Sequence, residues 1–406
     1  MGFNLDTSSN NPKNDDQLKI KRLVSVDLLR GLVMALMTLD HTRAFFSNAS
    51  FNPLDIEKSN IPLFFTRWIT HLCAPSFILI AGIAAYLSLQ RGKTKKQLSR
   101  FLVIRGFWLI FLELTVVSLA WTFYPGVFMA GILWAIGWSM IILAIVIQLP
   151  INSVATLGIM LIVGHNLFDS VQAEQLGNFG WIWSFLHERA IFVPIPGIRF
   201  FLSYPLIPWV GVILSGYAFG SVLTKSKTHR LHWLRNLGWG LIFSFLVIRG
   251  INIYGDPKPW SIQSTLWKTI LSFINCHKYP PSLAFLLITL GIAFLILYLF
   301  ETTYLLESKI KPFLKPLITL GRVPLFFYII HLWVIHFSAV ILALPKYGLK
   351  AITLPFLLSS RMPENYGYDL HHVYVLWLVM LVITYPICKW FANYKSKYRY
   401  WWLSFL

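Results

Sequence analysis

Apolar runs of 18 or more residues recur along almost the whole of this 406-residue chain, and each could cross about 30 Å of hydrocarbon as a helix. Hydrophobic residues make up 56% of the chain and charged residues only 13%, which excludes an ordinary soluble domain. The recurrence of the runs also excludes a protein with a single membrane anchor. The sequence therefore predicts an all-α integral membrane protein, a polytopic bundle of about ten (10–11) transmembrane helices.

Window length and turn residues define ten predicted spans, and the positions of Lys and Arg orient them. Most of the 35 Lys and Arg residues fall on one side, which predicts that 1–22 is a cytoplasmic amino-terminal segment, 23–394 a transmembrane domain and 395–406 a cytoplasmic tail. The outer side holds the longest connections, at 43–62, 169–200, 253–281 and 344–371, so activity is expected there. The predicted spans are 24–42, 63–89, 101–122, 127–149, 152–168, 201–223, 234–252, 282–300, 318–343 and 372–393.

Net charge and cysteine content exclude several function classes. The formal charge of +19 is carried by loops of a membrane protein, so no nucleic-acid partner is expected. The three cysteines are too scattered for a disulfide framework or a thiolate metal site, and no metal is expected. No Walker loop, dinucleotide fingerprint, HExxH motif or nucleophile elbow is present, which argues against an ATPase, a nicotinamide enzyme and a metalloprotease.

The first predicted span carries charged residues at both ends of an apolar middle. In "SVDLLRGLVMALMTLDHTR", residues 25–43, Asp27, Arg30 and His41 lie on one stripe of a helix, within about 80°. Asp27 and His41 are about 21 Å apart along the axis. Asp40 and Arg43 lie on another side, three residues apart, and are expected to pair. A charged residue in a bilayer core is energetically costly and usually has a function. A structural Asp27–Arg30 pair would also explain the charges in the first turn.

Two other spans bring histidines toward the outer surface. "TRWITHLCAP" places Arg67 and His71 one helical turn apart. In "GRVPLFFYIIHLWVIH", Arg322 and His336 are expected on one face of one helix, with His331 projecting elsewhere. A lone histidine in a span usually serves packing, but three in the outer half of one chain favour a site.

Other polar residues within the apolar stretches suggest a second site or a structural role. Arg22, Arg30, Arg105 and Arg322, together with Arg100, could converge at the inner surface, where guanidinium groups suit phosphates. The excess of positive charge on cytoplasmic loops is the alternative explanation. Glu113 is expected to find its partner on another helix, and snorkelling at outer span ends would explain His165, Arg249 and Lys278.

An ordered series of blocks resembles the catalytic domain of the heparan-alpha-glucosaminide N-acetyltransferase family, most closely its bacterial members. The first span is also similar to that of the acyltransferase-3 family, in which an Asp-x-Leu-Arg-Gly opening precedes an essential histidine that maps onto His41. The blocks are "RLVSVDLLRGLVMALMTLDH", "THLCAPSFILIAG", "LSRFLVIRGFWLIFLELTVV", "YPLIPWVGVILSGYAFG", "KYPPSLAFLLITLG" and "LGRVPLFFYIIHLWVIH".

The resemblance implies transfer of an acyl group, usually acetyl, from cytoplasmic acyl-CoA to a sugar or glycan on the other side of the membrane. Residues 23–394 would then be the acyltransferase domain, in a bacterial inner membrane with both termini cytoplasmic. The lipid bilayer, acyl-CoA and the acceptor are the implied partners, and a homodimer is one arrangement for the assembly. The cofactor site would comprise Arg22, Asp27, Arg30, Arg105 and Arg322. The catalytic residue would be His41, oriented by Asp40, His71 or His336. The substrate site would comprise Arg43, Arg67 and His331.

The mechanism is left open at this stage. The histidine usually assigned as catalytic in the lysosomal enzyme falls on Asn48 here, and His41 falls where that enzyme has asparagine. Either His41 forms an acyl-imidazole, or it assists direct transfer as a base. The alternative function is a proton-coupled transporter, in which Asp27, Glu113 and the histidines would form a relay.

Overall fold

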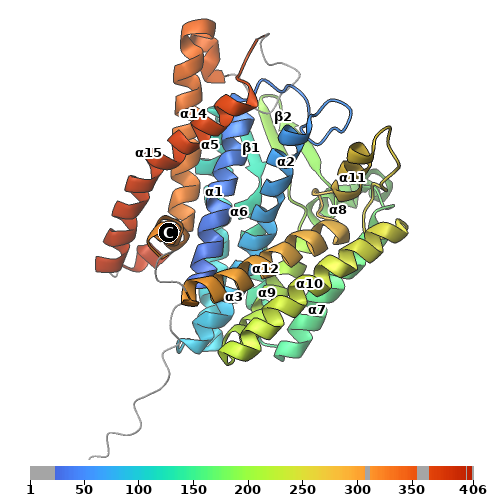
Figure 1. Cartoon of the computed structure of the whole chain (residues 1–406), viewed down its shortest axis with the longest axis vertical. Helices are drawn as coiled ribbons and strands as arrows, with labels where there is room; N and C mark the ends of the chain where they lie inside the picture. Colours follow the sequence, from blue (N-terminus) through green and yellow to red (C-terminus); the bar gives the residue numbers. More distant parts are fainter. Residues whose placement is uncertain (1–22, 307–310, 354–364, 399, 405–406) are drawn as a thin grey trace, which may run out of the picture.

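The computed structural model describes residues 23–306, 311–353, 365–398 and 400–404. Arg22 and the rest of the predicted amino-terminal segment lie outside these described residues. The protein is a helical bundle, with a small sheet and short helices gathered at one end (Figure 1). This architecture confirms the prediction of an all-α integral membrane protein.

Seven helical stretches among the described residues are long and apolar enough to cross a membrane. Two further apolar helices, α6 (Ile132–Val146) and α9 (Ile207–Leu223), are shorter, and α1 (Val24–Phe46) contains four charged residues. The count of ten spans therefore stays a prediction. The seven stretches are α2 to α3 (Ile61–Ile69 and Cys73–Gln90), α4 to α5 (Lys95–Leu112 and Ser118–Thr122), α7 with its terminal turn (Ile151–Gly164 and His165–Phe168), α10 (Lys227–Ile251), α12 (Leu283–Leu306), α14 (Pro324–Tyr347) and α15 (Leu370–Lys397).

Helix α1 lies in the middle of the bundle, where it packs against α3, α12, α14, α15 and α13 (Lys311–Arg322) (Figure 1). The crossing with α13 is very close, because a Cβ atom on Gly31 would lie 1.9 Å from the carbonyl oxygen of Leu317. Small residues allow helix backbones to approach in this way. At the same crossing, Arg30 donates a hydrogen bond of 3.0 Å to the carbonyl of Gly321. The Arg-Gly pair of the first span thus fixes α1 against α13.

The ninth predicted span is two helices, not one. Helix α13 ends at Arg322, Val323 has a non-helical backbone, and α14 begins at Pro324. Proline lacks the amide hydrogen that a continuing helix would need and suits the first turn of a new helix. The prediction that Arg322 and His336 share a face of one helix is therefore wrong.

Residues 169–202 form a small cap, and most of it is the stretch 169–200 that the sequence predicts as an outer connection. Strand β1 (Val127–Ala130) pairs in parallel with β3 (Ile198–Leu202), and β3 pairs antiparallel with β2 (Ala190–Ile195). The predicted spans 127–149 and 201–223 thus begin in strands rather than in helices. The cap also contains α8 (Gly180–Leu186) and the 3-10 segment Ala173–Phe179, and Figure 1 shows β2 and α8 on the same side of the bundle as α11 (Leu266–Ile274).

Candidate active site

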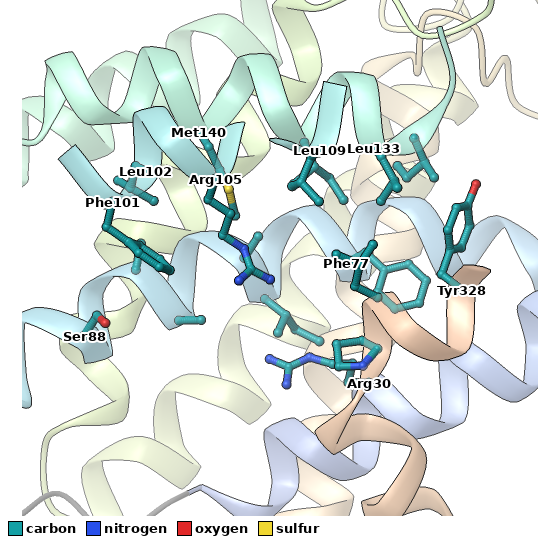
Figure 2. Close-up of a pocket in the computed structure, with 18 of the residues that line it drawn as sticks. Arg30, Phe77, Ser88, Phe101, Leu102, Arg105, Leu109, Leu133, Met140 and Tyr328 are labelled. Carbon is teal, nitrogen blue, oxygen red and sulfur yellow. The ribbon is translucent and has the colours of Figure 1, made fainter. Parts of the chain in front are cut away.

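A cavity of about 400 Å³ lies between α1, α3, α4, α6 and α14, and we refer to it as the arginine cavity. Figure 2 shows Arg30 and Arg105 extending into the same space, beside an apolar wall that includes Phe77 and Leu109. Several cations line a cavity that is otherwise mostly apolar, which suits a ligand with an anionic head and an apolar or amide-rich arm. The cations are Arg30, Arg91, Arg105, Arg322 and Lys395.

The arginine cavity brings together most of the residues predicted to bind a phosphate-bearing cofactor. Asp27 does not line it but pairs with Arg30, with 3.4 Å between the carboxylate and the guanidinium. Arg91 and Lys395 were not predicted, because at helix ends their charge is the ordinary signature of a cytoplasmic loop. Their approach to Arg30 depends on how α3 and α15 pack, which hydropathy does not reveal.

A second cavity, of about 380 Å³, adjoins the first, and we refer to it as the polar cavity. Phe77, Ile132 and Tyr328 line both cavities, so the arginine cavity adjoins the polar cavity at these side chains, and the polar cavity extends to the carboxyl-terminal end of α1. A third cavity, of about 570 Å³, continues into the loops and shares Arg67 and Tyr279 with the polar cavity. The polar groups lining the polar cavity include Asp40, His41, Arg43, Arg67, Glu113, Arg189, Lys278 and Tyr279.

His41 is held by His331, across the interface between α1 and α14. Nδ1 of His41 lies 2.8 Å from Nε2 of His331, and Nδ1 of His331 lies 2.8 Å from the carbonyl oxygen of Phe327. The carbonyl can only accept, so His331 carries its proton on Nδ1 and accepts from His41 at Nε2. His41 therefore carries its proton on Nδ1 as well. Its Nε2 is left with a lone pair, on a ring that lines the polar cavity.

Asp40 holds two arginines rather than a histidine. One of its oxygens accepts from Arg43 at 3.1 Å, and the other accepts from Arg67. The predicted pairing of Asp40 with Arg43 is confirmed. With both oxygens engaged in this way, Asp40 fixes the two guanidinium groups at the wall of the polar cavity. The role expected for Asp40 in orienting His41 is filled by His331 instead, a residue predicted to bind substrate.

The other two histidines expected beside His41 lie elsewhere. His71 is buried against the ring of Phe285, 5.1 Å between centroids, and lines the third cavity. His336 donates a hydrogen bond of 2.7 Å to the carbonyl of Ala120 and stacks on Phe123 at 3.6 Å. Neither contacts His41, so the expectation that one of them orients His41 is not met.

Four polar residues expected at structural positions are buried with defined partners. Glu113, at a π-helical turn, accepts a hydrogen bond of 2.9 Å from the amide of Leu133 and so stabilises the amino-terminal end of α6. Its partner is on another helix, as predicted. His165, Arg249 and Lys278 do not snorkel to the surface, because they are 1%, 3% and 9% exposed. Arg249 instead donates to the backbone carbonyl of Lys258, in the loop after α10, and to that of Phe273, near the end of α11.

Tyr279, in the loop before α12, is a site residue that sequence reasoning missed. Its ring packs edge-on against Tyr204, 5.3 Å between centroids, and Arg189 of the cap lies 4.8 Å above it. Burial alone would raise the pKa of this phenol, but the positive charges of Lys278 and Arg67 outweigh burial and lower its pKa to about 7. Only the "KYPPS" block hinted at this position, through the Lys-Tyr pair beside two prolines.

The fold and the two adjoining cavities define a class, that of polytopic membrane proteins with a half-buried histidine close to a cation-lined cavity. Within this class the chain belongs to the family described as heparan-alpha-glucosaminide N-acetyltransferase, catalytic, whose family model matches residues 22–255, more than half of the chain. Membership confirms the resemblance found in the sequence and makes the protein a membrane transferase of the acetyltransferase type; the family uses acetyl-CoA as donor. A search of curated proteins gives no match. His331 and Arg322 lie beyond the matched segment.

Proposed function

We propose that the protein transfers an acyl group, acetyl in the first instance, from cytoplasmic acyl-CoA to a sugar or glycan acceptor at the opposite face of the membrane. The observation that carries this proposal is that the two cavities adjoin and share Phe77, Ile132 and Tyr328. Acyl-CoA would occupy the arginine cavity, and the acceptor would enter the polar cavity from the loops.

The distance between Arg30 and His41 along α1 supports this placement of the donor. Arg30 and His41 are eleven residues apart on α1, which corresponds to about 16 Å along the helix axis. The pantetheine arm of CoA has thirteen bonds between its inner phosphorus and its sulfur, and at roughly 1.2 Å of advance per bond it reaches about 16 Å when extended. Phosphates held by Arg30 and Arg105 would therefore place the thioester beside His41.

The tautomer of His41 supports a role as general base. Its Nε2 lone pair can take the proton of an acceptor hydroxyl or amine while the acceptor oxygen or nitrogen attacks the thioester carbonyl. Collapse of the tetrahedral intermediate breaks the carbon–sulfur bond, and the proton returns from Nε2 to the leaving thiolate. Tyr328, which accepts a hydrogen bond from the indole of Trp121, can donate its own hydroxyl hydrogen to the developing oxyanion.

The position of Asn48 favours His41 over the residue that the family resemblance would assign. Asn48 is exposed and donates a hydrogen bond of 2.7 Å to Asp369. His41, by contrast, lines the polar cavity and has a fixed tautomer. We infer that His41 takes the catalytic role in this chain; an acyl-imidazole formed at the same Nε2 is the alternative chemistry for the same residue.

The contacts of the acidic residues give little support to the alternative of a proton-coupled transporter. Asp27 pairs with Arg30, and Glu113 accepts from the backbone of α6. Family membership also favours a transferase.

Release of free CoA by the purified protein in nanodiscs tests the proposal. Acetyl-CoA is supplied with and without candidate glycans, and wild type is compared with His41→Ala and with the matched surface variant His232→Ala. We expect acceptor-dependent release by wild type and His232→Ala, and none by His41→Ala, which should still bind CoA in calorimetry. Full activity of His41→Ala would remove His41 from the mechanism. Substrate uptake driven by a proton gradient, without thioester cleavage, would establish the transporter instead.

A further inference from the structure

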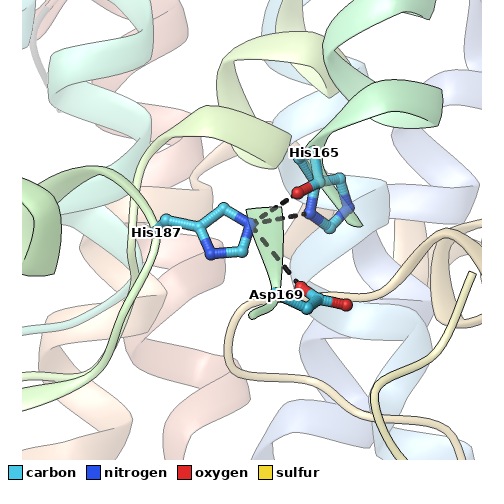
Figure 3. A group of neighbouring side chains, drawn as sticks. All are labelled: His165, Asp169 and His187. Carbon is cyan, nitrogen blue, oxygen red and sulfur yellow. Dashed lines mark hydrogen bonds and ion pairs between the residues drawn. The ribbon is translucent and has the colours of Figure 1, made fainter. Parts of the chain in front are cut away.

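Three metal-ligating side chains meet where α7 enters the cap (Figure 3). Nδ1 of His165 lies 3.4 Å from Nε2 of His187, and that Nε2 lies 3.7 Å from a carboxylate oxygen of Asp169. One ligand atom from each residue falls within 4.8 Å of the others. Both histidines are buried, 1% and 4% exposed, so the cluster is part of the interior and not a surface accumulation of polar groups.

These separations match the edges of a tetrahedral metal site. With bonds of about 2.0–2.1 Å from Zn²⁺ to nitrogen or oxygen, two ligands of a tetrahedron are roughly 3.3 Å apart. The observed 3.4 and 3.7 Å need shifts of only a few tenths of an ångström, and the third pair, Nδ1 of His165 and the ligand oxygen of Asp169, lies within 4.8 Å and closes to the same edge on binding. Two imidazoles and one carboxylate form a ligand set that suits Zn²⁺ better than Mg²⁺ or Ca²⁺, which prefer oxygen ligands.

The surroundings orient the three ligands without help from a metal. Asn166 donates a hydrogen bond of 2.7 Å to the second carboxylate oxygen of Asp169, and its own oxygen accepts from the amide of Leu283 at 2.9 Å. The ring of His187 stacks on Trp183, with 5.2 Å between centroids. Support of this kind from neighbouring groups is typical of metal sites.

Metal binding at Nε2 of His187 requires a change in the tautomer of this histidine. In this structure Nε2 of His187 donates a hydrogen bond of 2.8 Å to the backbone carbonyl of His165. Coordination at Nε2 requires the other neutral tautomer, with the proton on Nδ1. Because this carbonyl lies 2.8 Å from Nε2, metal binding also displaces it, and bonding to the metal offsets the lost hydrogen bond.

We propose that His165, Asp169 and His187 bind a Zn²⁺ ion, with water in the fourth position, as a structural site that fastens the cap to the end of α7. The ligands come from both ends of the segment 165–187, so the ion closes a loop that contains α8. Two residues further on, Arg189 lies over Tyr279 at the wall of the polar cavity. The site therefore holds the cap in the position that completes this wall.

Metal analysis tests this proposal without reference to acyl transfer. The full chain is purified through a tag that contains no histidine, equilibrated with ZnCl₂, desalted, and analysed by inductively coupled plasma mass spectrometry. We expect about one Zn²⁺ per chain in the wild type and a loss of that ion in His187→Gln and Asp169→Asn. The exposed cluster Asp369, His371 and His372 provides the control, because the double variant His371→Ala/His372→Ala should keep the ion.

Two results would overturn the proposal: wild-type protein without stoichiometric zinc, or zinc that is lost from the His371→Ala/His372→Ala control and kept by both cap variants. If the cap variants fail to fold, thermal unfolding of the wild type alone still tests the zinc site. ZnCl₂ should raise the Tm, and EDTA should reverse the rise. An unchanged Tm in the wild type would also refute the site. Neither measurement depends on CoA, so failure of the zinc proposal would not affect the proposed acyltransferase function.

Discussion

Replacement of His331 by phenylalanine is expected to slow acyl transfer without weakening donor binding. Phenylalanine fills the space of the imidazole but accepts no hydrogen bond, so the Nδ1–H group of His41 loses its partner at 2.8 Å. A buried donor left unsatisfied costs about 1–3 kcal/mol, and about 1.4 kcal/mol corresponds to a factor of ten in rate. Because His41 is then free to turn or to change tautomer, we expect kcat to fall about 10-fold to 100-fold.

The assay is single-turnover release of CoA from preloaded protein, with the Kd for CoA measured separately. His331→Gln is the matched conservative variant, because a glutamine oxygen can still accept from His41 and should restore part of the rate. His41→Ala sets the lower limit, since general-base catalysis contributes about 10²-fold to 10⁴-fold. A rate for His331→Phe equal to that of wild type, together with an inactive His41→Ala, would refute the idea that His331 positions His41.

Three further predictions concern the donor site, the helix crossing and the acceptor cavity. Arg105→Gln should raise the Kd for CoA about 10-fold to 100-fold in calorimetry, since hydrogen bonds to charged groups contribute about 1.5–3 kcal/mol, whereas exposed Arg235→Gln should leave it unchanged. Gly31→Ala should disrupt folding, so that the protein no longer elutes as a single monodisperse peak in size-exclusion chromatography. Gly240 has open space around it, so Gly240→Ala should leave protein stability unchanged or slightly raise it. The pKa of Tyr279 is lowered from its ordinary 10.0 to about 7, so the stability gained from its ionisation is complete above pH 10 and is lost as pH falls through 7. Wild type should show a tyrosinate absorbance with a midpoint near pH 7, which should be absent in Tyr279→Phe.

The membrane fold and the positions of Arg30 and His41 on α1 were predictable from sequence because they depend on local patterns. Apolar length defined the spans, and a 3.6-residue period placed Arg30 and His41 on one stripe of α1. The pairing of Asp40 with Arg43 followed from their spacing of three residues, and the structure confirms it. Sequence patterns were therefore reliable for α1, which is one unbroken helix, and failed at Arg322 and His336, where the helix breaks.

The partners across helices were not predictable, because they depend on how distant segments pack. His331 is 290 residues from His41, and its place on α14 follows from a helix break at Val323 that the apolar period hides. The outer connection 169–200 was predicted, but the small sheet was missed for a related reason: the strands β1 and β3 lie at the ends of apolar runs, where their residues look like the continuation of a helix. The metal-ligating group His165, Asp169 and His187 arises only when the cap folds back on α7.

The central claim is that one path connects a donor on one side of the membrane with an acceptor on the other. It is tested most directly in proteoliposomes of uniform orientation, with radiolabelled acetyl-CoA on one side only and the glycan acceptor on the other side only. Placement of the donor in the arginine cavity and of the acceptor in the polar cavity predicts labelled acceptor when acetyl-CoA is on the side of Arg30 and Arg105, and none in the reverse arrangement. Labelled product that forms only when both substrates share one side would contradict the account.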